Sequence, residues 1–161
     1  KNISKNIIYD KSYIKTKNII QEYQKSIFDF SKYWNDDFEQ LNIFFKSFNI
    51  NSSCDNDIVK PFFKDWSNMD GFAYLLVRPS NKIECAIILK TCHTCNILLT
   101  VSAGKTNLTG SATPMGGVVL STSALVTPDI ELDIKSKHAL SPVGISLETF
   151  RNRVLEISNN T

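Results

Sequence analysis

The chain has 161 residues, 18 of them basic and 16 acidic, for a net charge of +2 at neutral pH. This length is typical of one domain with its own core, and the 42% of hydrophobic residues excludes a wholly disordered chain. A charge so close to neutral excludes a protein that binds nucleic acid or a membrane surface mainly through electrostatics. No apolar run reaches the roughly 20 residues that a membrane-spanning helix needs.

The two halves of the sequence differ in their use of glycine and proline. Pro61 is the first proline and Gly71 the first glycine, whereas the later part carries all 6 glycines and most of the 5 prolines. A long stretch without either helix breaker indicates helices. The sequence therefore predicts helices first and a sheet second, within one core.

Apolar residues at steps of three and four predict three helices. The first covers about residues 12–34. The second covers about residues 37–48, and the segment Asn35, Asp36 and Asp37 supplies caps and negative charge at its start. A third helix closes the chain at Leu147–Ile157, and Ser146 is its predicted cap.

Short runs rich in β-branched and aromatic residues predict about five strands. They are the segments 72–78, 83–91, 96–102, 118–120 and 130–134. The connections between the first three are too short for parallel crossovers, so we expect an antiparallel meander. The predicted fold is α+β: this meander packed with N-terminal helices and a C-terminal helix. Trp66, just before the first strand, is expected to be a buried core residue.

Gly104, Lys105 and Thr106 follow a predicted strand, as the end of a phosphate-binding loop would. That motif needs another glycine where Leu99 stands, and a helix where glycines and prolines break the chain. We therefore interpret residues 103–117 as a flexible polar surface loop.

Cys92 and Cys95 form a Cys-x-x-Cys pair with His93 between them, a spacing typical of half a zinc site or of a redox pair. The remaining ligands would have to come from Cys54 and Cys85, which are single and far apart in sequence. Because the pair falls in a predicted hairpin connection, we expect a tight turn that binds no metal and has no redox role. The sequence predicts no catalytic residue and no cofactor.

Several segments are similar to the N-terminal FP domain of the proteasome-inhibitor family, a domain shared with an F-box ubiquitin-ligase subunit. They include an aromatic strand ending at a proline, a strand with a lysine near its end, an aliphatic strand, an acidic-alternating strand and a closing helix. These are residues 65–68, 72–79, 83–90, 96–101, 130–134 and 147–157. The resemblance divides the chain into a helical extension, residues 1–35, and an FP-like α/β domain, residues 36–161.

The resemblance implies a non-enzymatic protein-interaction and dimerisation domain of a proteasome regulator in the ubiquitin–proteasome system. Its partners would be itself, a related FP-like domain or the proteasome, with no nucleic acid, membrane, metal or cofactor. A cytoplasmic location, extending to the nucleus, is implied. The apolar helix face that carries Tyr23, Ile27 and Phe30 is the predicted partner-binding surface.

Two alternatives remain open from the residues alone. The first is a secreted or surface α/β domain with a binding role and two disulfides among its 4 cysteines. The second is a small enzyme or thiol–metal protein built on Cys92, His93 and Cys95.

Overall fold

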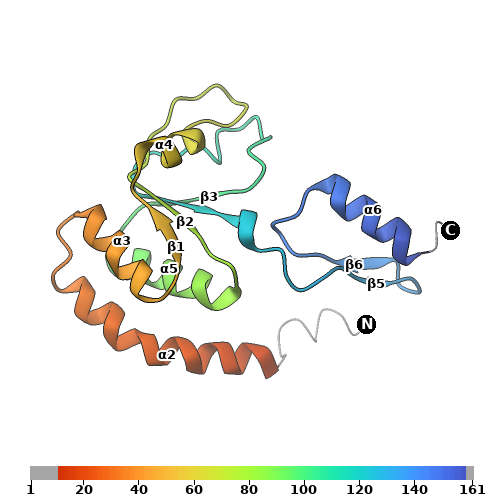
Figure 1. Cartoon of the computed structure of the whole chain (residues 1–161), viewed down its shortest axis with the longest axis horizontal. Helices are drawn as coiled ribbons and strands as arrows, with labels where there is room; N and C mark the ends of the chain where they lie inside the picture. Colours follow the sequence, from red (N-terminus) through yellow and green to blue (C-terminus); the bar gives the residue numbers. More distant parts are fainter. Residues whose placement is uncertain (1–10, 159–161) are drawn as a thin grey trace.

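The computed structural model describes residues 11–158 and confirms a mixed α+β fold within them (Figure 1). The helices are α2 (Lys11–Ser31), α3 (Phe38–Ser47), α4 (Asn56–Val59), α5 (Lys82–Thr94) and α6 (Leu147–Ile157), with the short 3-10 helices η1 (Lys60–Phe62) and η2 (Thr122–Ala124). The strands are β1 (Asn51–Ser53), β2 (Leu75–Arg78), β3 (Leu99–Ser102), β4 (Val118–Ser121), β5 (Glu131–Asp133) and β6 (His138–Leu140). Among the described residues, no helix combines the length and apolarity needed to cross a bilayer.

The main sheet has four strands in the order β1-β2-β4-β3. β4 pairs in parallel with both β2 and β3, and only β1 is antiparallel to its neighbour. The expected five-stranded antiparallel meander is therefore wrong. Parallel strands require long connections, which are supplied by α5 between β2 and β3 and by residues 103–117 between β3 and β4.

The meander was expected because residues 83–91 resemble a strand, but they form most of α5. Asn81 caps this helix, since its side-chain oxygen accepts hydrogen bonds from the backbone of Ile83 and Glu84, each at 3.0 Å. Glu84 accepts in return from the backbone N–H of Ser80, the residue before the cap, at 2.8 Å, an arrangement related to the capping box. α5 packs against α2 as well as the sheet, so it is apolar on more than one side and lacks a clear helical stripe.

Both faces of the sheet are covered, as is usual for parallel strands. Successive side chains of a strand point to opposite faces, and β2 follows this rule. Leu75 and Val77 lie in the larger core cluster with residues of α2, α3 and α5, which lie on one side of the sheet (Figure 1). Leu76 packs with Val59 of α4 in a smaller cluster.

The helix face predicted to bind a partner packs within this chain. Ile27 is only 1% exposed in the main core cluster, and Tyr23 and Phe30 pack against that cluster. The Phe30 ring stacks on Phe44 with centroids 4.2 Å apart. A partner-binding role for these residues stays a prediction. The division at residue 35 also stays a prediction, and residues 1–10 of the proposed extension lie outside the described residues.

Trp66 is not a buried core residue, because 68% of its surface is exposed. It lies in the turn-rich segment between η1 and β2, where the chain turns its neighbour Asp65 inward instead. The aromatic character of Trp66 indicated burial, but nothing in the local sequence specified which of the two adjacent side chains points inward.

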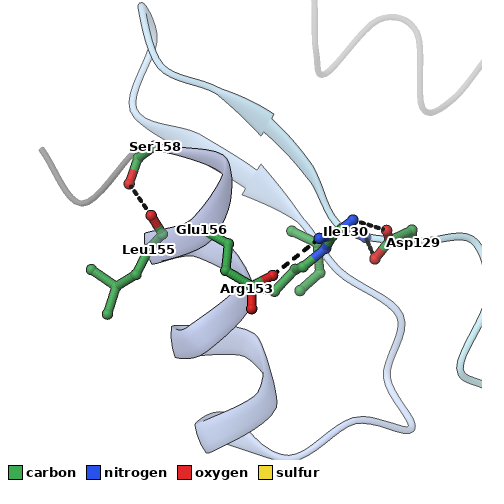
Figure 2. Close-up of polar contacts among 6 residues, drawn as sticks. All are labelled: Asp129, Ile130, Arg153, Leu155, Glu156 and Ser158. Atoms are coloured by element: carbon green, nitrogen blue, oxygen red, sulfur yellow. Dashed lines mark hydrogen bonds and ion pairs between the residues drawn. The ribbon is translucent and has the colours of Figure 1, made fainter.

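The predicted strand at 130–134 and the closing helix are confirmed as β5 and α6. β5 pairs antiparallel with β6, and the hydroxyl of Ser146 accepts from the backbone N–H of Thr149 at 3.0 Å, which caps α6. Arg153 of α6 joins the helix to the start of β5 through an ion pair with Asp129 at 2.7 Å (Figure 2). This unit lies to one side of the main sheet (Figure 1).

Replacement of Leu76 should lower stability far more than replacement of Trp66. Leu76→Ala removes a fully buried side chain and should lower the free energy of unfolding by about 2–5 kcal/mol. Trp66→Ala removes a largely exposed one and should cost less than about 1 kcal/mol. Urea denaturation of both variants measures the difference, and a larger loss for Trp66→Ala would contradict the described packing.

Candidate functional site

The parallel strands bring three residues side by side at one edge of the sheet. Arg78 ends β2, Ser102 ends β3 and Ser121 ends β4. In register, Ser102 is opposite Ser121, and Arg78 follows Val77, which is opposite Leu120. We call this row, which lies at the carboxyl ends of β2, β3 and β4, the carboxyl edge. In open sheets of parallel strands, ligands bind outside the carboxyl ends of the strands.

Residues 103–111, the carboxyl-edge loop, leave the sheet directly after Ser102. Among the described residues, no hydrogen bond uses the backbone N–H of Gly104, Lys105 or Thr106. Lys105 has a positive φ of 57°, and consecutive N–H groups around such a residue can form a concave anion site. A Cβ at Gly104 would meet only a methyl group of Thr106, at 4.0 Å, so a ligand can approach the backbone closely there.

Two buried hydroxyls near this loop lack partners within the described part of the chain. They belong to Ser102, which is fully buried, and Thr113, which is 5% exposed. Nearly all buried polar side chains have a hydrogen-bond partner, so an unpaired one indicates that a ligand or water is its partner. Of the two residues, Ser102 is the one that lies at the carboxyl edge, directly before the loop.

Two positive charges lie at the same edge: Arg78 ends β2, and Lys105 belongs to the loop that follows β3. The Lys105 ammonium lies 4.6 Å from the centre of the Phe62 ring, and the Arg78 guanidinium lies 6.0 Å from it. Lys105 also donates to the carbonyl oxygen of Pro61 at 2.6 Å. Cation–π contacts of this kind hold cations without neutralising them. The carboxyl edge therefore has the charge and the free donors that an anion requires.

Asp65 joins the carboxyl-edge loop to the segment before β2. Its carboxylate is buried and accepts hydrogen bonds from the backbone of Ser67 at 2.9 Å, the side chain of Asn107 at 2.5 Å and the backbone of Ala112 at 3.3 Å. Hydrogen bonds from Ser67 first, and then from Asn107 and Ala112, hold the pKa of Asp65 well below its ordinary value, although burial acts in the opposite direction.

The Cys-x-x-Cys pair lies elsewhere and not in a hairpin connection, so that part of the prediction is wrong. Cys92 is in the last turns of α5 and Cys95 is its C-cap. Burial raises the pKa of Cys92 to about 12 and also raises that of Cys95, which disfavours the reactive thiolate. Within residues 11–158 no cluster of three acidic, histidine or cysteine side chains could hold a metal, and all four cysteines are free thiols.

A second hollow lies at the opposite, amino ends of the same strands. It is an open groove of about 600 Å³ whose walls include Phe72, Tyr74, Leu98 and Met115. Phe38 stacks on Tyr74 there, with ring centroids 4.6 Å apart. The groove is also lined by Asp36, Asn96, Gly116 and Gly117, and its lining among residues 11–158, unlike the carboxyl edge, contains no lysine or arginine.

The sequence interpretation missed the site for an identifiable reason. Residues 103–117 were expected to be a surface loop, but Ala112, Thr113 and Pro114 are buried, as are Gly116 and Gly117. The phosphate-binding motif of nucleotide hydrolases requires a helix after the loop. Here the next element is the strand β4, so the chain lacks that motif. The sequence feature that could have indicated the site is the run of glycine, serine and threonine directly after β3. This run indicates a ligand site only if β3 is parallel to its neighbour, which the sequence did not show.

No protein-family model matches the chain, and no curated protein matches it. It is similar in structure to wild-type BBE-like 1 of Physcomitrella patens and to a variant of it, with TM-scores of 0.57 and 0.60 and identities of 9% and 8%. It is also similar to the xylooligosaccharide oxidase of Myceliophthora thermophila in complex with xylobiose, with a TM-score of 0.56 and 12% identity. Each match covers 70% of this chain but only 24% or 25% of the other protein.

These similarities show the fold, and the chain spans about a quarter of the length of the proteins it matches. The expectation of a protein without catalysis is contradicted, because the structures with this fold include an oxidase. The similarity to the FP domain, its proteasome partners and the cytoplasmic location stay predictions that these observations do not test.

The Asp65 carboxylate should make stability depend on pH below its ordinary pKa of 3.8. A lowered pKa in the folded state means that the unfolded state binds the proton first, so the stabilisation is complete at neutral pH and is lost as the pH falls below about 4. The stability difference between the wild type and Asp65→Asn should therefore be largest at neutral pH and shrink in acid. Urea denaturation across this range measures it.

Glu131→Gln provides the control, because Glu131 is an exposed carboxylate on β5. Its stability difference from the wild type should stay near zero throughout. A difference for Asp65→Asn that is the same in acid and at neutral pH would show that the charge of Asp65 is not what the folded state stabilises.

Proposed function

We propose that the chain is part of a flavin-dependent oxidoreductase, and that its carboxyl edge binds the diphosphate of a flavin dinucleotide. The observation that carries this proposal is the set of free backbone N–H groups at Gly104, Lys105 and Thr106, beside the unpaired hydroxyl of Ser102. The similarity to an oxidase supports the choice of reaction class.

The chemistry of oxidation favours a flavin as the ligand. Side chains of the ordinary amino acids do not reversibly accept a hydride, so an oxidase relies on a cofactor, and flavins serve both hydride transfer and oxygen chemistry. A flavin dinucleotide also carries a diphosphate, which is the anionic group that free N–H donors and two cations would bind. When bound, the flavin would supply the two-electron chemistry.

The residues of the chain fit a diphosphate in three ways. The N–H groups of Gly104, Lys105 and Thr106 can donate hydrogen bonds to phosphate oxygens without first breaking bonds within the described chain. Arg78 and Lys105 supply positive charge from the ends of β2 and β3. The hydroxyl of Ser102 can donate where water is excluded, and hydrogen bonds to charged groups are stronger than neutral ones.

Gly104 offers the sharpest test of this site. The nearest atom to a Cβ built at Gly104 is a methyl carbon of Thr106 at 4.0 Å, which is an ordinary van der Waals contact and not a clash. Gly104→Val should therefore leave the melting temperature nearly unchanged, while its side chain fills the space through which a phosphate reaches the backbone. We expect binding of FAD, measured by quenching of flavin fluorescence, to weaken by roughly tenfold or more.

Two further variants test whether FAD binding depends on a cation at the carboxyl edge or only on the net charge of the protein. Arg78→Ala should also weaken FAD binding, whereas Lys135→Ala, which removes an exposed cation from the β5–β6 turn, should not. If Gly104→Val binds FAD as tightly as the wild type, or if the wild type binds none, the proposed site is wrong.

A further inference from the structure

We infer that Asp65 is a positioning residue of the carboxyl edge: it holds the carboxyl-edge loop in the shape that leaves its N–H groups free for a ligand. The inference rests on the proposed function, since the ligand concerned is the diphosphate of the flavin dinucleotide. Asp65 itself contacts the loop and not the proposed ligand position.

The contacts of Asp65 join the loop at its middle and at its end. Asn107 lies halfway along the loop and donates to one carboxylate oxygen, and Ala112, the first residue after the loop, donates its backbone N–H to the same oxygen. The other oxygen accepts from Ser67, which lies on the segment that leads into β2. One buried side chain therefore fixes the loop to a segment more than 40 residues away in sequence.

Other contacts leave residues 104–106 free. The Asn107 amide also donates to the hydroxyl of Ser111 at 3.0 Å, and the backbone N–H of Thr113 donates to the carbonyl oxygen of Gly110 at 3.0 Å. Both contacts close the second half of the loop. Within the described part of the chain, the first half is held by the Lys105 side chain alone, so its backbone geometry depends on where Asp65 anchors Asn107. Loops that are ordered before binding lose less conformational entropy on binding, which raises affinity.

The chemistry of the position requires a carboxylate. Three donors from Ser67, Asn107 and Ala112 point at the side chain, and a carboxylate has acceptor sites for all of them and no donor of its own. An asparagine of the same shape would have to direct its amide N–H group at one of these donors. A negative charge near an anion site would otherwise weaken binding, but here its lone pairs face donors of the protein.

The test compares Asp65→Asn with the control Asp70→Asn. Asp70 is an exposed carboxylate nearby that pairs with Lys64. Hydrogen exchange of residues 103–112 and the dissociation constant of FAD are measured for each variant. For Asp65→Asn we expect faster exchange in the loop and roughly tenfold weaker FAD binding, and for Asp70→Asn no change in either.

A double variant, Asp65→Asn with Asn107→Asp, exchanges the amide and the carboxylate across the same contact. It should recover part of the lost exchange protection and part of the lost affinity, because the amide placed at position 65 would then donate to the carboxylate placed at position 107. Recovery of exchange protection without any recovery of FAD affinity would contradict the positioning role.

The outcomes distinguish the inference from the proposed function. Unchanged loop exchange in Asp65→Asn overturns the inference even if the wild type binds FAD. Faster exchange with unchanged FAD affinity overturns the positioning role as well. Failure of the wild type to bind FAD overturns the proposed function and the positioning role that rests on it, while the exchange data still report whether Asp65 orders the loop.

Discussion

The parallel pairing of β4 with both β2 and β3 is the constraint on which the rest of the structure depends. Because parallel neighbours cannot be joined by a hairpin, the chain needs a helix between β2 and β3 and a long connection between β3 and β4. The helix, α5, covers one face of the sheet and carries α2 on its outer side. The long connection begins as the carboxyl-edge loop, at the edge where Arg78, Ser102 and Ser121 lie side by side.

Much of the local structure was predictable from the sequence, but its topology was not. The helices α2, α3 and α6 have clear apolar stripes. Ser146 caps α6 as expected, and Asp37, from the segment 35–37 expected to supply caps, caps α3. The error at α5 came from its position against both the sheet and α2, which removes the polar face that identifies a helix. The capping pair Asn81 and Glu84 was the signal that could have corrected it. When residues 83–91 are interpreted as a strand, the connections between the first three predicted strands are short, which favours an antiparallel arrangement.

Two facts kept the site from being predicted: the direction of β3 was misassigned, and the residues that hold the loop are far apart in sequence. Gly104 to Thr106 is informative only when β3 runs parallel to β2 and β4, because that arrangement places the loop at an edge where strands end together. Asp65 is separated from Asn107 by more than 40 residues, and no local pattern links them. Sequence favoured the adjacent Trp66 as the buried residue, although the structure buries Asp65, which three donors satisfy.

Recognition of the diphosphate by the carboxyl-edge loop is the central claim, and competition binding with fragments of the cofactor tests it most directly. ADP contains the diphosphate of FAD without the flavin, and riboflavin contains the flavin without any phosphate. If the free N–H groups and the cations of the carboxyl edge supply the affinity, ADP should displace FAD from the wild-type chain, and riboflavin at the same concentration should not. Displacement by riboflavin with none by ADP would contradict the account.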